Sequence, residues 1–233
     1  MLVKKGCIVW VLLFASSFLI IEVGLATYEG PWTTGYAFCG FEAFPGPGLK
    51  GDIYTIDPAM EGLNNMYESL TIVLSYYNYW WLQWGYMKGW SCIPLFSAKY
   101  YYEVWDSIHL NPGPMKLTQG PSPGTWHRYY IMHPFEYGEC SDPHFWEFYL
   151  EGGALYHYAY VFPYYAVDQR AYIETSTNTI RIDGSHYKDL SYFIEIHYWH
   201  WQLWDEHVTI ETDPQHYHLN QVSDSEFTAW GGA

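Results

Sequence analysis

The sequence predicts an all-β protein in which two antiparallel sheets stack as a β-sandwich. Aromatic residues make up 21% of the chain, and tyrosine, tryptophan and β-branched residues favour strands. Hardly any stretch keeps a helical period of apolar residues over about twelve positions. Strand-like runs are instead separated by clusters of Gly, Pro, Asn and Asp, and many short strands with frequent turns are typical of sandwiches and barrels.

The candidate strands are distributed over the whole chain after its N-terminal segment. They lie near 32–41, 52–56, 68–75, 79–87, 99–109, 126–133, 145–150, 155–162, 171–175, 178–182, 190–199, 207–211 and 226–230. The Gly/Pro-rich segment 111–124 is the longest break, and we expect one long loop there because both of its flanks look like strands of the same kind. The stretch "ETSTNTIRI" predicts a hairpin around Asn178.

Residues 1–26 have the layout of a secretory signal peptide. Two lysines precede the apolar run "GCIVWVLLFASSFLIIEVGLA", which ends in small residues. The run is long for a signal peptide and contains Glu22, so an uncleaved N-terminal membrane anchor is the alternative. In both cases we expect residues 27–233 to form one β-sandwich domain that is secreted or held on the outer face of the membrane.

The charge of the chain excludes one class of partner. The formal net charge is −15, and residues 27–233 keep 8 basic and 24 acidic residues, a charge of −16. Nucleic acid is therefore not expected as a partner, because phosphate binding needs a basic surface. A strongly acidic surface suits acidic conditions, where carboxylates protonate and their mutual repulsion fades.

The cysteine and histidine patterns predict no metal and no other cofactor. Cys39, Cys92 and Cys140 follow the leader, which allows one disulfide and one free thiol, and the sequence does not choose the pair. There is no tight metal-ligand spacing such as CxxC. The histidine clusters at 197–201 and 216–218 are expected to be strand residues with one polar edge.

Three polar residues stand inside aromatic strands with little polar company. Gln83 lies in "WWLQWGY", Glu103 in "KYYYEVWDS" and Glu174 in "RAYIETS". A buried carboxamide needs hydrogen-bond partners, and leaving it without them costs about 1–3 kcal/mol. For each residue alone the ordinary interpretation is a strand end or the solvent-facing side of a strand.

The segments around these three residues match a known pattern in the right order. "WLQWG" at 81–85 is similar to a strand ending in "QxG", and "KYYYEVWDS" at 99–107 is similar to a "YxWYEWYP" strand. "AYIE" at 171–174 is similar to an "AEWIVE" segment. Together they resemble the eqolisin-type glutamic endopeptidases, which are secreted, acid-acting proteases.

Four further segments extend this resemblance over most of the chain after the leader. They are "GPWTTGY" at 30–36, "GTWHRYYIM" at 124–132, "FWEFYLEGG" at 145–153 and "SEFTAW" at 225–230. The sequence departs from the family in having "QWG" where a small residue usually follows the glutamine. It also resembles the neprosin type more distantly, in which a glutamate tends to replace that glutamine.

The resemblance implies a β-sandwich of concanavalin-like architecture and a polypeptide substrate. It assigns Gln83 and Glu174 as the catalytic pair. A carboxylate can take the proton from water and return it to the leaving amine, while a carboxamide N–H can stabilise the developing oxyanion. The residues expected to line the cleft and bind substrate lie on the two aromatic strands. They are Trp81, Trp84, Tyr86, Tyr102, Glu103 and Trp105.

Two other functions are left open by the residues. Aromatic platforms also suit sugars, so a carbohydrate-active or carbohydrate-binding β-sandwich is an alternative, with Glu103 and Glu174 as acid and nucleophile about 5–9.5 Å apart. A non-catalytic extracellular structural subunit is the third possibility. It would show no convergent polar pair and a large exposed apolar patch.

Overall fold

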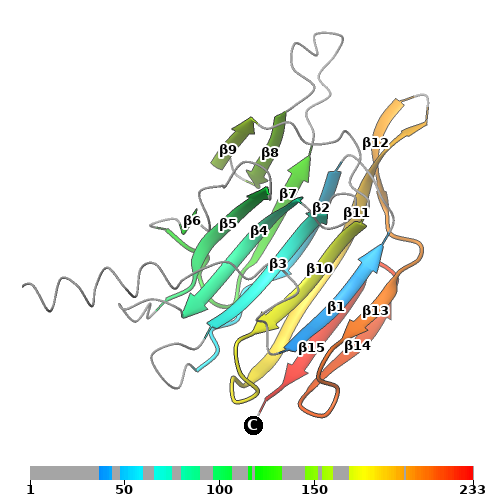
Figure 1. The fold of residues 1–233 in the computed structure, drawn as a ribbon. Coiled ribbons are helices and arrows are strands. Elements are labelled where there is room, and N and C mark those ends of the chain that lie inside the picture. The colour runs from blue at the N-terminus through cyan, green and yellow to red at the C-terminus, as the bar shows by residue number, and fades with distance from the viewer. Residues whose placement is uncertain are drawn as a thin grey trace, which may run out of the picture.

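The protein, described from a computed structural model, is built from antiparallel strands (Figure 1). The structure describes residues 37–43, 48–59, 66–74, 80–89, 97–106, 115–116, 119–132, 145–151, 154–159, 168–196 and 198–232. Every strand pairing in this part is antiparallel, and no helix occurs in it. The leader 1–26, the segment 30–36, Cys92 and Cys140 lie outside the described residues. The predicted all-β class is confirmed.

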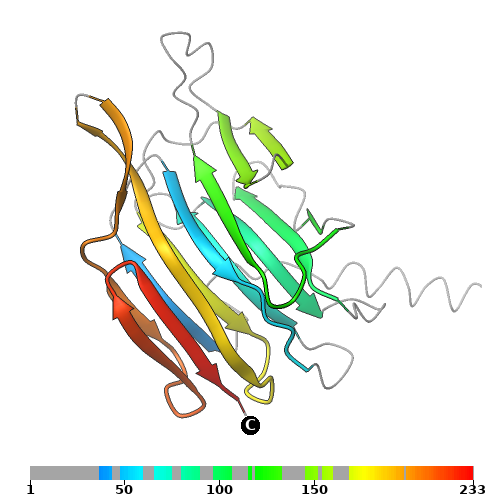
Figure 2. The ribbon, with the colours of Figure 1, turned by 180° about the vertical axis from the view of Figure 1, so that it is seen from behind.

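Two sheets form the layers of the sandwich. The seven-stranded sheet has the order β13 (Val208–Glu211), β1 (Ala37–Ala43), β10 (Asp168–Thr175), β3 (Met66–Leu74), β4 (Trp80–Gly89), β5 (Lys99–Asp106), β6 (Met115–Lys116). The eight-stranded sheet has the order β14 (Tyr217–Ser223), β15 (Glu226–Gly231), β11 (Ile182–Ile196), β2 (Gly48–Tyr54), β7 (Trp126–Met132), β8 (Phe145–Leu150), β9 (Ala154–Ala159). A further strand, β12 (Tyr198–Leu203), pairs with β11. Figure 2 shows the eight-stranded sheet from its outer side.

The core lies between the sheets and is dominated by aromatic rings. Trp84 of the first sheet is fully buried, with its ring centroid 5.4 Å from that of Tyr129 and 6.2 Å from that of Phe148. Its Nε1 donates a hydrogen bond of 2.8 Å to the carbonyl of Tyr149 on β8. Phe41 and Phe227 extend the core with centroids 4.5 Å apart. Burial of such rings supplies most of the force that joins the layers.

Strand alternation then decides which residues face outward. Because successive side chains point to opposite faces of a sheet, Gln83 lies on the face opposite to Trp84. Tyr101 likewise lies opposite to Tyr100, whose ring is 6.1 Å from that of Trp84 in the core. The seven-stranded sheet therefore carries Gln83 and Tyr101 on its outer face, which is turned toward the viewer in Figure 1.

The expected hairpin around Asn178 is wrong. β10 belongs to the seven-stranded sheet and β11 to the eight-stranded one, so residues 176–181 connect the two layers. The predicted strands 178–182 and 190–199 are also replaced by one long β11, which continues through an irregularity near Asp189. Turn chemistry signals a change of direction, but it does not say whether the next strand pairs with the last one.

Two edge strands were not predicted. The short β6, which pairs with β5, lies within the segment 111–124 that was expected to be one long loop. β14, "YHLNQVS", pairs with β15 and is largely exposed. Its weak apolar pattern follows from its position, because an edge strand with one solvated side needs few buried residues. Within the described residues no helix is long and apolar enough to cross a membrane.

Candidate functional site

Gln83 on β4 is part of a closed group of three polar side chains. Its Nε2 donates one hydrogen bond of 2.9 Å to the hydroxyl of Tyr101 and another of 2.5 Å to Oε2 of Glu103. The Tyr101 hydroxyl donates in turn to the same Oε2 at 2.7 Å. All three residues are buried. The carboxamide is thus satisfied by polar partners supplied from the neighbouring strand.

Strand pairing brings these three residues together. Gln83 is the register partner of Glu103, and Tyr101 is the partner of Gly85. Directly paired residues of antiparallel strands point to the same face, and Tyr101 stands two positions before Glu103, which is the strand period. Because Gly85 has no side chain, the phenol ring of Tyr101 has no cross-strand side chain directly beside it on β4.

Glu174 on β10 lies on the same outer face but not beside Gln83. Arg170 pairs with Ile72, and Ile72 pairs with Gln83, so Arg170 is the β10 residue at the level of the carboxamide. Glu174 is four positions further along, which corresponds to about 13 Å along the strands and about 10 Å across two strand spacings. The two Cα atoms are then about 16 Å apart in a flat sheet. Glu174 is 4% exposed, and its register partner on β3 is Glu68.

An ion pair occupies the level of Gln83 on the strands beyond β3. Arg170 Nη2 lies 2.5 Å from Glu42 Oε2, and Arg170 is itself largely buried. Arg170, Glu42 and Tyr101 were not among the predicted site residues. Tyr101 could have been found, because a residue two positions before Glu103 in a strand must share its face.

Three of the five predicted substrate-binding rings face the core between the sheets. Trp84 and Tyr86 are fully buried between the sheets, on the face opposite to Gln83. Tyr102 also points toward the other sheet, with its ring 5.5 Å from that of Phe148. The expectation that they line a cleft with Gln83 is corrected by simple alternation: positions 84, 86 and 102 differ in parity from 83 and 103.

The remaining two predicted rings are seen only as backbone. Trp81 and Trp105 are register partners on β4 and β5, and their side chains lie outside the described part. The assignment of both to substrate binding stays a prediction.

Tyr86 has a structural function instead. Its hydroxyl accepts a 2.9 Å hydrogen bond from the backbone N–H of Ile56 and lies 3.3 Å from the carbonyl of Tyr54, to which it donates. Burial raises the pKa of Tyr86 well above its ordinary value, and the neighbouring Tyr67 hydroxyl adds to this effect. Tyr86 therefore ties the end of β2 to β4 as a neutral phenol.

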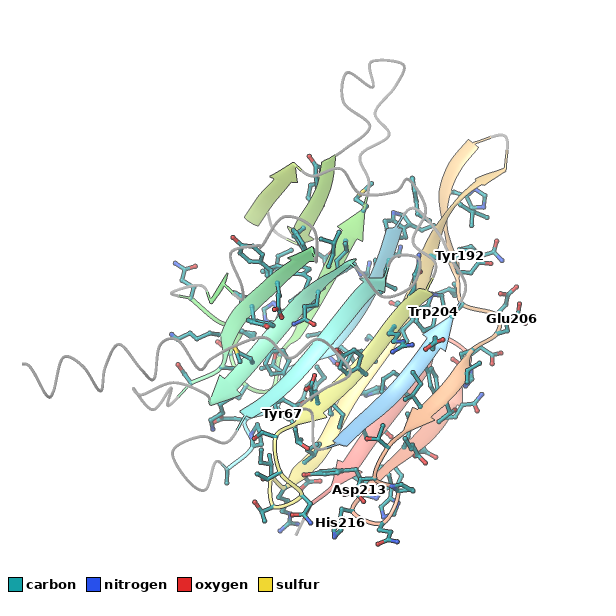
Figure 3. All side chains as sticks on the ribbon, in the orientation of Figure 1. Tyr67, Tyr192, Trp204, Glu206, Asp213 and His216 are labelled. Atoms are coloured by element: carbon teal, nitrogen blue, oxygen red, sulfur yellow. The ribbon has the colours of Figure 1, made fainter. Side chains whose placement is uncertain are left out.

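Other polar clusters and hollows lie away from Gln83. No group of three or more His, Cys, Asp or Glu that could hold a metal occurs among the described residues. His216 Nδ1 lies 2.8 Å from Asp213 Oδ2, at the edge of the sandwich far from β4 and β5 (Figure 3). A hollow of about 370 Å³ is lined at the ends of β11 and β15. Its lining residues are Arg181, Ile182, Asp183, Trp230, Gly231 and Gly232.

Known structures share this fold. Scytalido-glutamic peptidase, solved with a peptide-based transition-state analogue, aligns with a TM-score of 0.54 and 8% identity over 85% of this chain and 100% of its own. SCP-B, described as a member of the eqolisin family and bound to the tripeptide Ala-Ile-His, aligns with a TM-score of 0.50 and 9% identity over the same shares. No family model and no curated protein sequence matches the chain. The likeness lies in the fold, and the structural neighbours are glutamic peptidases.

Proposed function

We propose that this chain is a secreted acid endopeptidase of the glutamic type. The observation that carries the proposal is the Gln83–Glu103 contact of 2.5 Å on the outer face of the seven-stranded sheet. A carboxamide held by a buried carboxylate is an uncommon feature for a sheet face, because burying both groups has a desolvation cost. The fold neighbours are peptidases bound to a transition-state analogue and to a peptide, which supports a polypeptide as the substrate.

The proposed chemistry divides two tasks between two kinds of side chain. A carboxylate removes a proton from the attacking water and later gives it to the leaving amine. The carboxamide of Gln83 cannot titrate, so it keeps its N–H donors at any pH, and these can stabilise the oxyanion when they face it. One such donor is typically worth about 2.7–4 kcal/mol in the transition state.

Glu174 is the proposed general base, on the strength of the "AYIE" resemblance. Its burial and its position on the same sheet face as Gln83 support this assignment. The register separation of about 16 Å does not support it, so Glu103 must be tested beside Glu174. We propose acid conditions for the reaction because an unperturbed glutamate titrates near about 4.3 and the chain is strongly acidic.

The test is an assay of the purified protein on a denatured protein substrate across the pH range. Proteolysis should be strongest at roughly pH 2–5 and fall toward neutrality. Glu174→Gln should abolish activity with an unchanged circular dichroism spectrum, since the side chains are nearly isosteric. An optimum above pH 7, or full activity in both Glu174→Gln and Glu103→Gln, would show that the proposed chemistry is wrong.

The carbohydrate-active alternative is not favoured by the register. Glu103 and Glu174 are three strands apart and four positions out of level, which gives about 20 Å between their Cα atoms in a flat sheet. An acid–nucleophile pair needs carboxyl groups about 5–9.5 Å apart. The assay should therefore include a β-glucan as a second substrate, and we expect no hydrolysis of it.

A further inference from the structure

The Gln83 carboxamide is oriented by its two neighbours on β5. A primary amide has two N–H donors on nitrogen and one acceptor oxygen. In this structure Nε2 donates to the Tyr101 hydroxyl and to Glu103 Oε2. Since the amide group is planar, Oε1 points away from both of these acceptors. The donors that would stabilise an oxyanion are thus turned toward β5.

An ionised Glu103 permits only this orientation. A carboxylate only accepts hydrogen bonds, and here one oxygen accepts from both Gln83 and Tyr101. A turn of the amide by half a revolution would place Oε1 at 2.5 Å from that oxygen. Two acceptors at such a distance repel each other, so ionised Glu103 holds the N–H groups where they are.

A protonated Glu103 permits the opposite orientation. The carboxylic acid is a donor as well as an acceptor. After the amide turns, Oε1 can accept one hydrogen bond from the Glu103 acid and one from the Tyr101 hydroxyl, because an amide oxygen has two lone pairs. Both hydroxyl protons are then used by Oε1, so the Tyr101–Glu103 hydrogen bond of the present orientation is lost, and both N–H groups of Gln83 point away from β5.

We propose that Glu103 is the positioning residue of the site, and that its protonation permits the Gln83 carboxamide to turn so that its N–H groups donate to the substrate carbonyl. The inference rests on the proposed peptidase function and deepens it, because it makes acid a requirement for assembling the oxyanion donor. The Tyr101 hydroxyl serves both orientations, because it accepts a hydrogen bond from Gln83 in one and donates a hydrogen bond to Gln83 in the other.

Some of the charged groups around the three residues favour the ionisation of Glu103, and others oppose it. Lys99 shares the face of Glu103 two positions beyond Tyr101, and the Arg170–Glu42 ion pair lies at the level of Gln83 on β10 and β1. The cations favour an ionised Glu103 and Glu42 opposes it. Glu174 lies further along β10.

The first test compares pH profiles of proteolysis for wild type and Glu103→Gln. A glutamine at 103 cannot ionise, so it can donate to Gln83 Oε1 at every pH. We expect the decline of kcat/KM toward neutral pH to move up by at least about one pH unit, which is a tenfold change in proton concentration. Glu226→Gln is the matched control, since it removes a carboxylate from the other sheet, where Glu226 binds His186 at 2.8 Å. Superimposable profiles of wild type and Glu103→Gln would overturn the proposal.

The second test does not depend on activity. With ¹⁵N-labelled glutamine, the side-chain NH₂ signals of Gln83 are assigned by their loss in Gln83→Met. We expect these signals to shift with pH along a single titration in wild type and to stay constant in Glu103→Gln. Signals that do not titrate in wild type, or that titrate equally in the variant, would contradict the proposal. If wild type cleaves no protein substrate but its signals titrate as expected, the peptidase function fails and the positioning role stands.

Tyr101→Phe is a second variant of the same hydrogen-bonded group, and it leaves Glu103 in place. It removes a hydroxyl and no charge. We expect kcat to fall several-fold in this variant while the midpoint of the pH profile stays near that of wild type, because the ionising group is still present. A midpoint that moves as far as in Glu103→Gln would assign the titration to the phenol and reject Glu103.

Discussion

Gln83 and Glu103 face each other across β4 and β5 with 2.5 Å between Nε2 and Oε2, and both are 4% exposed. A donor to a buried carboxylate is among the stronger hydrogen bonds in proteins, with a net value of about 1.5–3 kcal/mol. This contact explains how a carboxamide is accommodated in the strand "WWLQWGY". It also makes the two residues inseparable in any mutational test.

Replacement of Gln83 by alanine should affect stability and catalysis separately. Loss of the donor leaves a buried carboxylate with one partner fewer, which should lower the free energy of unfolding by about 1–3 kcal/mol. If the carboxamide stabilises the oxyanion, kcat should fall by about 10²–10³ with a smaller change in KM. Urea denaturation and steady-state kinetics measure the two effects. A change in KM alone would mean that Gln83 only binds the substrate.

Gln83→Glu should make stability depend on pH. Two carboxylates would then stand where 2.5 Å now separates donor and acceptor, and both cannot ionise without strong repulsion. In acid one of them keeps a proton and can donate to the other, so the variant should unfold close to wild type. As the pH rises the repulsion develops in the folded state and is relieved by unfolding, so stability should be lost toward neutrality.

The measurement for this variant is urea denaturation in acid and at neutral pH. Gln221→Glu provides the matched control, since it adds the same charge at an exposed position of β14. Equal loss of stability at both pH values in Gln83→Glu would indicate a steric effect rather than charge repulsion.

Trp84 should prove to be a core residue. Its full burial and its contacts with Tyr129 and Phe148 predict that Trp84→Ala destabilises the fold by about 3–5 kcal/mol. Trp230→Ala, at a site that is 41% exposed, should change stability far less. Chemical denaturation monitored by circular dichroism gives both values. A stable Trp84→Ala variant with a raised KM would restore Trp84 to the substrate-binding set.

Alkaline unfolding should be coupled to buried tyrosines. Burial raises the pKa of both Tyr86 and Tyr129 well above the ordinary value, which is about 10. The folded-state pKa exceeds that of the unfolded chain, so this contribution to stability is complete below about pH 10 and is lost as the pH rises further. Phenolate absorbance should therefore rise together with the loss of circular dichroism. Full ionisation of these phenols in a still folded protein would contradict the assignment.

The sequence by itself determined the all-β class and marked Gln83 as a polar residue that needs partners. Aromatic content and frequent turns are local properties, and they are sufficient to predict strands and a sandwich. A lone Gln83 among tryptophans was visible as an anomaly because burial of an amide requires a partner. The presence of Glu103 in the next aromatic strand was visible for the same reason.

Only the tertiary structure decided which residues share a face of the sheet and which lie at the same position along neighbouring strands. Register is set by pairing over the whole sheet, and a one-residue shift turns every side chain to the other face. That is why Trp84 and Tyr86 lie in the core instead of beside Gln83, and why Glu103 rather than Glu174 contacts the carboxamide. The crossing at 176–181 between the layers was decided in the same way, because a turn fixes a local direction while the sheet that receives the next strand depends on contacts far along the chain.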